Sequence, residues 1–275
     1  MAFDLEGIID SHIHTGPDHN PRAHTDIEAA RAAAQAGMRA IGIKSHHTLT
    51  ADRAAIAESI VDGVRVFGGL TLNSAVGGLN ATAVENALRM GARIIWMPTQ
   101  DAAHNRRVKG NSGGISVLST DGNLRPDVFP ILELIRQSEA VLATGHLAPP
   151  ESARLINAAV DMGVEKIVVT HPESGSVKMP LPMQQALSKL GVFFERCYLH
   201  TTKSVAAPVS IAEIAAHIRS VGIASTILAT DFGRADLPNP VAGMQMYLDA
   251  LLNEGFTYYD LYQMAGSTPA DLFAL

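Results

Sequence analysis

The chain repeats one pattern of hydrophobic and polar positions. An alanine-rich amphipathic stretch ends at a glycine, and a short apolar run rich in β-branched residues begins a few residues later. Gly37 before residues 40–43 and Gly91 before residues 94–96 are two examples. Glycine adopts the left-handed conformation that ends many helices, and strands buried on both faces of a parallel sheet read as continuous apolar runs. The pattern therefore predicts helices that alternate with parallel strands.

The pattern predicts eight strands at similar spacing. We expect them over residues 8–13, 40–45, 64–70, 93–98, 140–145, 166–170, 191–196 and 226–230. Helices lie between them, and two or three more are expected over residues 240–274. The strand ends are about 31 residues apart, which is the length of a βαβ unit. Eight such units close into a (β/α)8 TIM barrel, so we predict this α/β fold with extra C-terminal helices; an open doubly wound sheet is the rival.

No linker or shift in composition divides the chain, so we expect residues 1–275 to form a single domain. The longest interval between predicted strands contains a polar stretch with Arg106, Arg107 and Lys109. We expect this stretch to form a long loop over one end of the barrel, because long ordered loops are commonly lids or binding loops.

Composition narrows the classes of function. Hydrophobic residues make up 47% and charged residues 17%, which excludes a disordered or fibrous chain. A net charge of −6 argues against a nucleic-acid partner. The single cysteine, Cys197, fits a reducing compartment, and neither a signal peptide nor a membrane-spanning run is evident. We expect a cytoplasmic protein with a small-molecule substrate and no membrane partner; a homo-oligomer is possible.

Histidines gather at the predicted carboxyl ends of the strands. In TIM-barrel enzymes the catalytic groups lie at these ends, and residues i and i+2 of one strand point to the same face. Two histidines with that spacing can therefore bind one ion, and imidazole with carboxylate suits zinc. The strand-end residues that can carry chemistry are His12, His14, Lys44, His46, His47, His146, His171 and Asp231.

Five of these residues resemble the metal ligands of the amidohydrolase superfamily, and the small single-barrel members most closely. In that superfamily a His-x-His follows strand one, single histidines follow strands five and six, and an aspartate follows strand eight. Residues 266–273 also resemble its closing helix, so the likeness covers the whole chain. The matching residues are His12, His14, His146, His171 and Asp231.

The resemblance implies a metal-dependent hydrolase that uses metal-activated water on an amide, ester, lactone or related bond of a small molecule. The cofactor implied is one or two divalent ions, with Zn2+ favoured. Asp231 is then both a metal ligand and the catalytic group that moves the proton. The alternatives are a metal-dependent lyase or decarboxylase, a phosphoesterase on the same barrel, and a non-catalytic metal-binding protein.

The group that bridges two ions is the main departure from the superfamily pattern. Two-metal members usually carry a carboxylated lysine or a glutamate after strand four, and residues 96–100 contain neither. We hypothesise that carboxylated Lys44 forms the bridge, since a lysine buried near cations loses its proton readily. Glu195 is a second candidate, and a mononuclear site without a bridge is the alternative.

Several other residues receive weaker assignments. We expect His46 and His47 to bind substrate or support the ligands. The cations of the long loop, Arg106, Arg107 and Lys109, either form a solvated loop face or guide an anionic substrate group. Cys197 is expected to be a small buried side chain. Four further histidines are expected on loops or the surface: His19, His24, His200 and His217.

Overall fold

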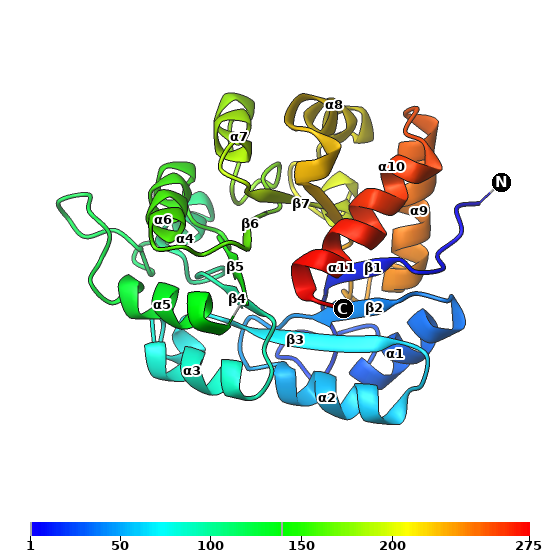
Figure 1. The fold of residues 1–275 in the computed structure, drawn as a ribbon, viewed down its shortest axis with the longest axis horizontal. Coiled ribbons are helices and arrows are strands. Elements are labelled where there is room, and N and C mark those ends of the chain that lie inside the picture. The colour runs from blue at the N-terminus through cyan, green and yellow to red at the C-terminus, as the bar shows by residue number, and fades with distance from the viewer. Residues whose placement is uncertain (1, 139) are drawn as a thin grey trace.

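Eight strands form a parallel ring in the computed structural model, which describes residues 2–138 and 140–275 (Figure 1). Each strand pairs with the next one along the chain. Every observed strand lies inside its predicted range or exceeds it by one residue, so the predicted (β/α)8 TIM barrel is confirmed. The strands are β1 Ile9–Ile13, β2 Ala40–Ile43, β3 Arg65–Thr71, β4 Ile94–Trp96, β5 Val141–Ala143, β6 Ile167–Thr170, β7 Phe193–Cys197 and β8 Thr226–Ala229.

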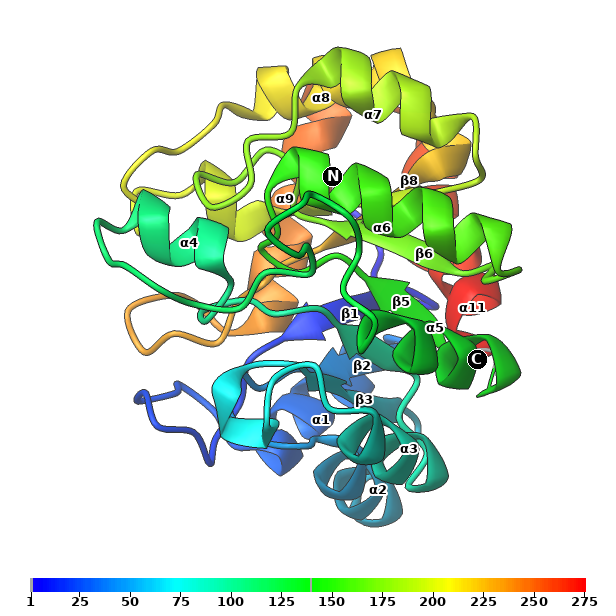
Figure 2. The same ribbon diagram turned by 90° about the vertical axis from the view of Figure 1, so that its left-hand side faces the viewer.

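Helices follow the strands and cover the outside of the ring (Figure 2). Local sequence starts the first of them, because Thr25 forms a capping box with Glu28. Among the described residues, we find no helix with the length and hydrophobicity that a bilayer crossing requires. The α-helices of this part of the chain are α1 Asp26–Gln35, α2 Ala51–Ile60, α3 Ala81–Arg89, α4 Ala103–Val108, α5 Val128–Ser138, α6 Pro149–Asp161, α7 Leu181–Ser188, α8 Ile211–Val221, α9 Pro240–Asn253, α10 Tyr258–Tyr262 and α11 Thr268–Phe273.

The chain between β4 and β5 corrects one expectation. The sequence predicts a long loop there, but Arg106 and Arg107 lie in helix α4. The buried residue of α4 is polar Asn105, so this short helix carries no apolar periodicity that a sequence pattern can reveal. An irregular stretch follows it and leads to α5.

Apolar side chains close the amino-terminal end of the barrel. Inside the ring, Ile9, Phe67 and Ile94 pack in one cluster with residues of α11. The ring of Phe273 lies 4.7 Å from that of Phe67. Arg93, which precedes β4, donates to the Phe273 carbonyl at 2.8 Å. Helix α11 therefore covers this end, and the polar residues at the opposite end of the strands are left to form a site.

The first and last strands meet at what we call the β1–β8 seam. The backbone N–H of Asp231 donates to the carbonyl of His12 at 2.8 Å, and that of His14 donates to the carbonyl of Phe232 at 2.7 Å. Gly233 has a φ of 135°, and a Cβ there would lie 1.7 Å from the His14 carbonyl oxygen. Closure of the barrel therefore places Asp231 directly beside His12 and His14.

Candidate metal centre

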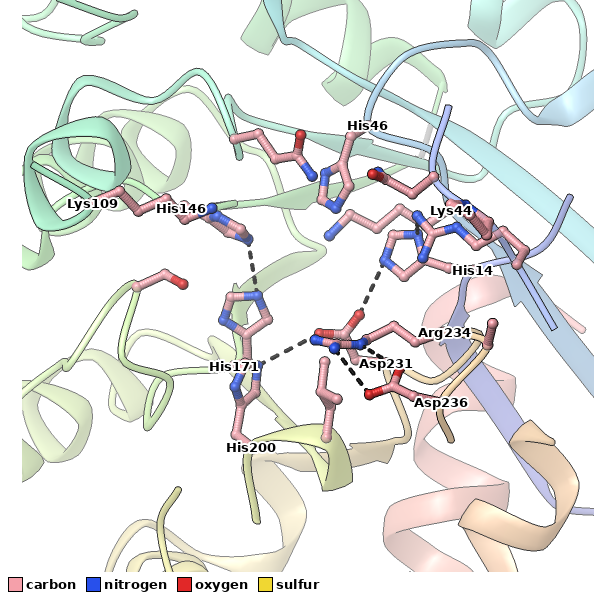
Figure 3. Close-up of a pocket in the computed structure, with 17 residues that line it drawn as sticks. His14, Lys44, His46, Lys109, His146, His171, His200, Asp231, Arg234 and Asp236 are labelled. Atoms are coloured by element: carbon pink, nitrogen blue, oxygen red, sulfur yellow. Dashed lines mark hydrogen bonds and ion pairs between the residues drawn. The ribbon is translucent and has the colours of Figure 1, made fainter. Parts of the chain in front are cut away.

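A cavity of about 540 Å³ opens at the carboxyl ends of the strands (Figure 3). Its volume lies within the roughly 300–1,000 Å³ that small-molecule sites have. Lys44 and Asp231 contribute to its wall. Five histidines also line it, namely His14, His46, His146, His171 and His200.

Asp231 contacts the two histidines of β1 and the segment that follows it. Its Oδ1 atom lies 3.1 Å from Nε2 of His12 and 3.1 Å from Nε2 of His14. These three residues form one group whose ligand atoms all lie within 4.8 Å of one another. The predicted His-x-His pair and the predicted aspartate are thus brought together.

A second group of histidines lies across the cavity. Nε2 of His146 is 3.1 Å from Nε2 of His171. Nε2 of His200 is 3.5 Å from Oδ2 of Asp231, and its ring lies 4.6 Å from the ring of His171. His171, His200 and Asp231 form a second group with ligand atoms within 4.8 Å of one another. Asp231 therefore offers one carboxylate oxygen to each group.

His200 corrects the sequence-based expectation that it lies on a loop or the surface. It is 8% exposed and belongs to a short 3-10 turn, Tyr198–Thr201, directly after β7. No apolar periodicity marks this turn. The position of His200 at a predicted strand end was the signal that could have identified it, because strand seven was placed correctly.

Backbone strain occurs at two residues of the site. His171 has a φ of 28° and Asp231 a φ of 56°, both in the left-handed region that non-glycine residues rarely adopt. Such conformations cost about 1–3 kcal/mol each and cluster at functional sites. The surrounding fold thus holds both side chains in position at an energetic cost.

Lys44 follows β2 and reaches the same cavity. It is 1% exposed, and its Nζ atom has no hydrogen-bond partner among the described residues. Nζ lies 5.0 Å from the centre of the Trp96 ring. Burial lowers the pKa of the Lys44 amine. These surroundings suit the neutral amine from which a carbamate forms.

Glu195, the second candidate for a bridging ligand, lies on the other side of His12. Nδ1 of His12 donates to Oε2 of Glu195 at 2.9 Å, while Nε2 faces Asp231. Glu195 is therefore placed to orient the His12 ring rather than to bridge the two histidine groups. Cys197 is buried, as expected, with Sγ 3.8 Å from Nδ1 of His12.

The two histidines predicted to contact substrate differ in location. His46 lines the main cavity, and its Nδ1 atom lies 2.8 Å from Oγ1 of Thr99. His47 lines a separate cavity, where its ring stacks on that of His19 at 4.2 Å. Only His46 of this pair is therefore placed to meet a ligand in the main cavity.

The cations of the cavity differ in part from those predicted. Arg106 and Arg107 do not line it, and Nε of Arg106 donates to the carbonyl of Ser112 instead. Lys109 reaches the cavity from the end of α4. Sequence patterns missed two further arginines in its wall, Arg22 and Arg234, because they come from loops that meet only in the folded chain.

Burial sets the charge of the histidines. It lowers the pKa of His146 and of His171 well below the usual value, so both rings are neutral and can offer a lone pair to a cation. His12 differs: burial and Lys44 oppose its protonation, but the carboxylates of Asp231 and Glu195 raise its pKa to about 9. The two carboxylates that stabilise a positive charge on the His12 ring would equally stabilise a metal cation bound to that ring.

The donor set fits a divalent ion. Nε2 of His12 and Nε2 of His200 are buried and have no hydrogen-bond partner among the described residues. Buried polar atoms normally have a partner. A cation held by imidazole nitrogens and the Asp231 carboxylate satisfies these atoms, and this is the ligand chemistry of zinc.

Comparison with family models matches residues 7–195 to one family, described as "Family of unknown function (DUF6282)". This match covers more than half of the chain. No curated protein matches the sequence significantly.

Solved structures of several hydrolases have the same fold. An amidohydrolase from Pseudomonas aeruginosa is 12% identical with a TM-score of 0.63, over 98% of this chain and 95% of that chain. An organophosphorus hydrolase from Deinococcus radiodurans is 13% identical with a TM-score of 0.62, over 98% and 93%. A Xaa-Pro dipeptidase with bound methionine in its active site is 13% identical with a TM-score of 0.66, over 98% and 75%. The resemblance to amidohydrolases is thus confirmed at the level of the fold.

Proposed function

We propose that this chain, which belongs to the DUF6282 family of unknown function, is a metal-dependent hydrolase of small molecules. The bond cleaved is an amide, ester, lactone or related bond. The hydrolases with the same fold support this reaction class. At their low identity to this chain they do not specify the substrate, so the proposal depends on the site itself.

One observation carries the proposal. A single buried carboxylate, that of Asp231, lies between two groups of histidines at the catalytic end of a TIM barrel. A structural zinc site closes with four protein ligands, whereas this arrangement brings more donors to an open cavity. The arrangement therefore supports a catalytic centre over a purely structural one.

The two groups indicate how ions would be held. One ion would be bound by the β1 histidines with Asp231, and a second by the histidines that follow β5 and β6, with His200 beside them. Lys44, as a carbamate, would join the two, and a mononuclear site without it is the alternative. When bound, a divalent ion lowers the pKa of a water to about 7 and polarises the scissile carbonyl or phosphoryl oxygen. The proposed ligands are His12, His14, Lys44, His146, His171 and Asp231.

Asp231 moves the proton in this proposal. Burial alone raises the pKa of its carboxyl, but the charge of His12 and the nearby ring nitrogens of His12, His14 and His200 hold that pKa well below its usual value. The carboxylate is therefore ionised, and in this proposal its Oδ2 atom accepts a proton from the attacking water. It then delivers the proton to the leaving nitrogen or oxygen.

We propose that residues 1–275 act as one domain with a small-molecule substrate. The single cysteine supports a cytoplasmic location.

Zinc-loaded protein tests the proposal directly. Metal content is measured by mass spectrometry, and esters, lactones, amides and phosphotriesters are screened with product identification. We expect zinc-dependent hydrolysis in one of these classes. Asp231→Asn should lower kcat by at least about a hundredfold without unfolding the protein. Asp161→Asn, an exposed change at the end of α6, is the matched control and should keep the wild-type rate.

Other outcomes point away from a hydrolase. Release of carbon dioxide from a carboxylate library, without hydrolysis, would indicate a decarboxylase. Zinc binding without turnover of any class would indicate a non-catalytic metal-binding protein.

A further inference from the structure

We propose that the substrate carries an anionic oxygen group, a carboxylate or a phosphate-type group, that Arg22 binds with Lys109 and Arg234. This inference rests on the proposed function, because it names the substrate class of the same cavity. Three features support it. They are the charge of the cavity wall, the unpaired Nε–H of Arg22 and the pairing of two loops.

The wall of the cavity has an excess of positive charge. Three cationic side chains besides Lys44, and two acidic ones, line it. The whole chain, in contrast, has a net charge of −6. A concave site of one sign concentrates ligands of the opposite sign. These charged wall residues are Arg22, Lys109, Arg234, Asp231 and Asp236.

Arg22 has hydrogen-bonding capacity that the chain does not use. Its side chain is 8% exposed, and Nη2 lies 3.0 Å from Oδ2 of Asp18. Its Nε atom is buried without a partner among the described residues. Leaving a buried N–H of a charged group unpaired is costly. The planar fork of arginine matches the two oxygens of a carboxylate or phosphate, so such a group supplies the missing acceptors.

Two loops place a second arginine next to the first. Arg22 and Arg234 face each other in an antiparallel bridge between the loops that follow β1 and β8. Like charges at such directly opposite positions are destabilising. Arg234 is held by Asp236 through contacts of 2.9 and 3.0 Å, and a bound anion reduces the remaining repulsion. Figure 3 shows Lys109 and Arg234 reaching the cavity from opposite sides of the view.

Arg22 is also close to a proposed metal ligand. Its Nη2 atom lies 3.5 Å from Nδ1 of His14. A substrate group bound by Arg22 is therefore held beside the centre where the bond is cleaved. The arrangement fits a small acid whose anionic group and scissile bond are only a few atoms apart.

Calorimetric titration of the zinc-loaded protein tests this inference without requiring turnover. The probes are succinate, its neutral analogue succinamide, and inorganic phosphate; the first and third distinguish a carboxylate from a phosphate preference. We expect at least one anion to bind at least tenfold more tightly than succinamide. Arg22→Met should lower the affinity for that anion by at least about tenfold, because a hydrogen-bonded charge is lost.

Two further variants and a control separate recognition from folding. Arg22→Met leaves Asp18 without its partner, so Arg22→Lys, which keeps the charge, should show an intermediate affinity. Lys109→Met changes an exposed residue. It should lower the affinity for the anion about threefold with no change in zinc content. Arg107→Met, an exposed arginine outside the cavity, should bind within twofold of the wild type.

The inference is overturned if succinamide binds as tightly as the anions, if no anion binds, or if Arg22→Met and Lys109→Met bind anions like the wild type. A failure of this inference can be distinguished from a failure of the proposed hydrolysis. If the wild-type protein binds anions more tightly than Arg22→Met but turns over no substrate, the recognition site is supported and only the proposed reaction is refuted.

Discussion

At the scale of single residues, His12 is the best supported side chain of the site. Glu195 contacts its Nδ1 atom at 2.9 Å and Asp231 lies 3.1 Å from its Nε2 atom, so carboxylates flank both edges of the ring. A carboxylate behind a histidine ligand fixes the tautomer and the orientation of the ring. Glu195 is therefore a positioning residue for His12.

Replacing Glu195 with Gln should weaken zinc binding by about ten- to hundredfold, because the amide no longer holds the Nδ1 proton as strongly. Competition with a chromophoric chelator measures this affinity. Glu165→Gln, at an exposed position before β6, is the matched control and should bind zinc like the wild type. Unchanged affinity in Glu195→Gln would show that the carboxylate has no orienting role.

If Lys44 forms the proposed carbamate bridge, it determines how many ions the site holds. In the presence of bicarbonate we expect about two zinc ions per chain, and Lys44→Met should bring this ratio toward one because the bridging anion is lost. Metal analysis of desalted protein gives the ratio. Lys189→Met, which changes an exposed lysine, should leave it at the wild-type value. A wild-type ratio near one that bicarbonate does not alter would exclude the carbamate bridge.

The side chains that sequence could place are those with a local signature. His12 and His14 share one strand end, and His146, His171 and Asp231 each follow a recognisable apolar run. The side chains that it missed have weaker signals. His200 follows a predicted strand end but lies on a short turn without apolar periodicity. Arg22 meets the β8 loop only in the folded barrel, so no spacing along the chain identifies it.

At the scale of secondary structure, the β1–β8 seam joins the two ends of the sheet. Asp10 of β1 accepts hydrogen bonds from the backbone N–H of Thr230 at 3.0 Å and from its hydroxyl at 2.5 Å. The same hydroxyl oxygen accepts from the N–H of Phe232 at 3.2 Å. All these groups are buried, so each depends on the others for its partners.

Thr230→Val should lower the free energy of unfolding by about 1–3 kcal/mol, because a buried oxygen of Asp10 loses its donor. The corresponding fall in Tm is about 2–4 °C for each kcal/mol in a chain of this size. Thr230→Ser retains the hydroxyl and serves as the control, with a much smaller loss. Thermal unfolding followed by circular dichroism measures both. A loss in Thr230→Val no larger than that in Thr230→Ser would contradict the role assigned to the hydroxyl, because valine keeps the methyl group and serine keeps the hydroxyl.

The strands and most helices could be predicted because their own residues carry the signal. Most strands are buried on both sides and read as apolar runs, as in Ile167–Thr170. Helix α4 lacks such a signal, since its buried residue is polar Asn105 and its length is six residues. Short elements of this kind form through tertiary contacts, which single-sequence periodicity does not contain.

At the scale of the whole molecule, the site lies where eight strands converge, so a bound ion would stabilise the complete barrel. Removing zinc with a chelator should lower Tm, because ligands that bind only the folded state add RT ln(1 + [L]/Kd) to its stability. At a thousandfold excess over Kd this amounts to about 4 kcal/mol, or roughly 10 °C. Differential scanning calorimetry of the zinc-loaded and stripped protein measures the shift.

His171→Asn should reduce that shift, while His104→Asn, which changes a histidine outside the cavity, should preserve it. A stripped protein that melts at the same temperature as the loaded one would contradict tight binding at this centre.

The position of the seam has a consequence for how the protein is made. Residues 7–195, the part that matches the family model, contain the histidines at 12, 14, 146 and 171, but His200 and Asp231 come later. A nascent polypeptide emerging from the ribosome thus carries most of the imidazoles long before the shared carboxylate appears. High-affinity capture of the proposed ion would consequently wait until the eighth strand docks against the first.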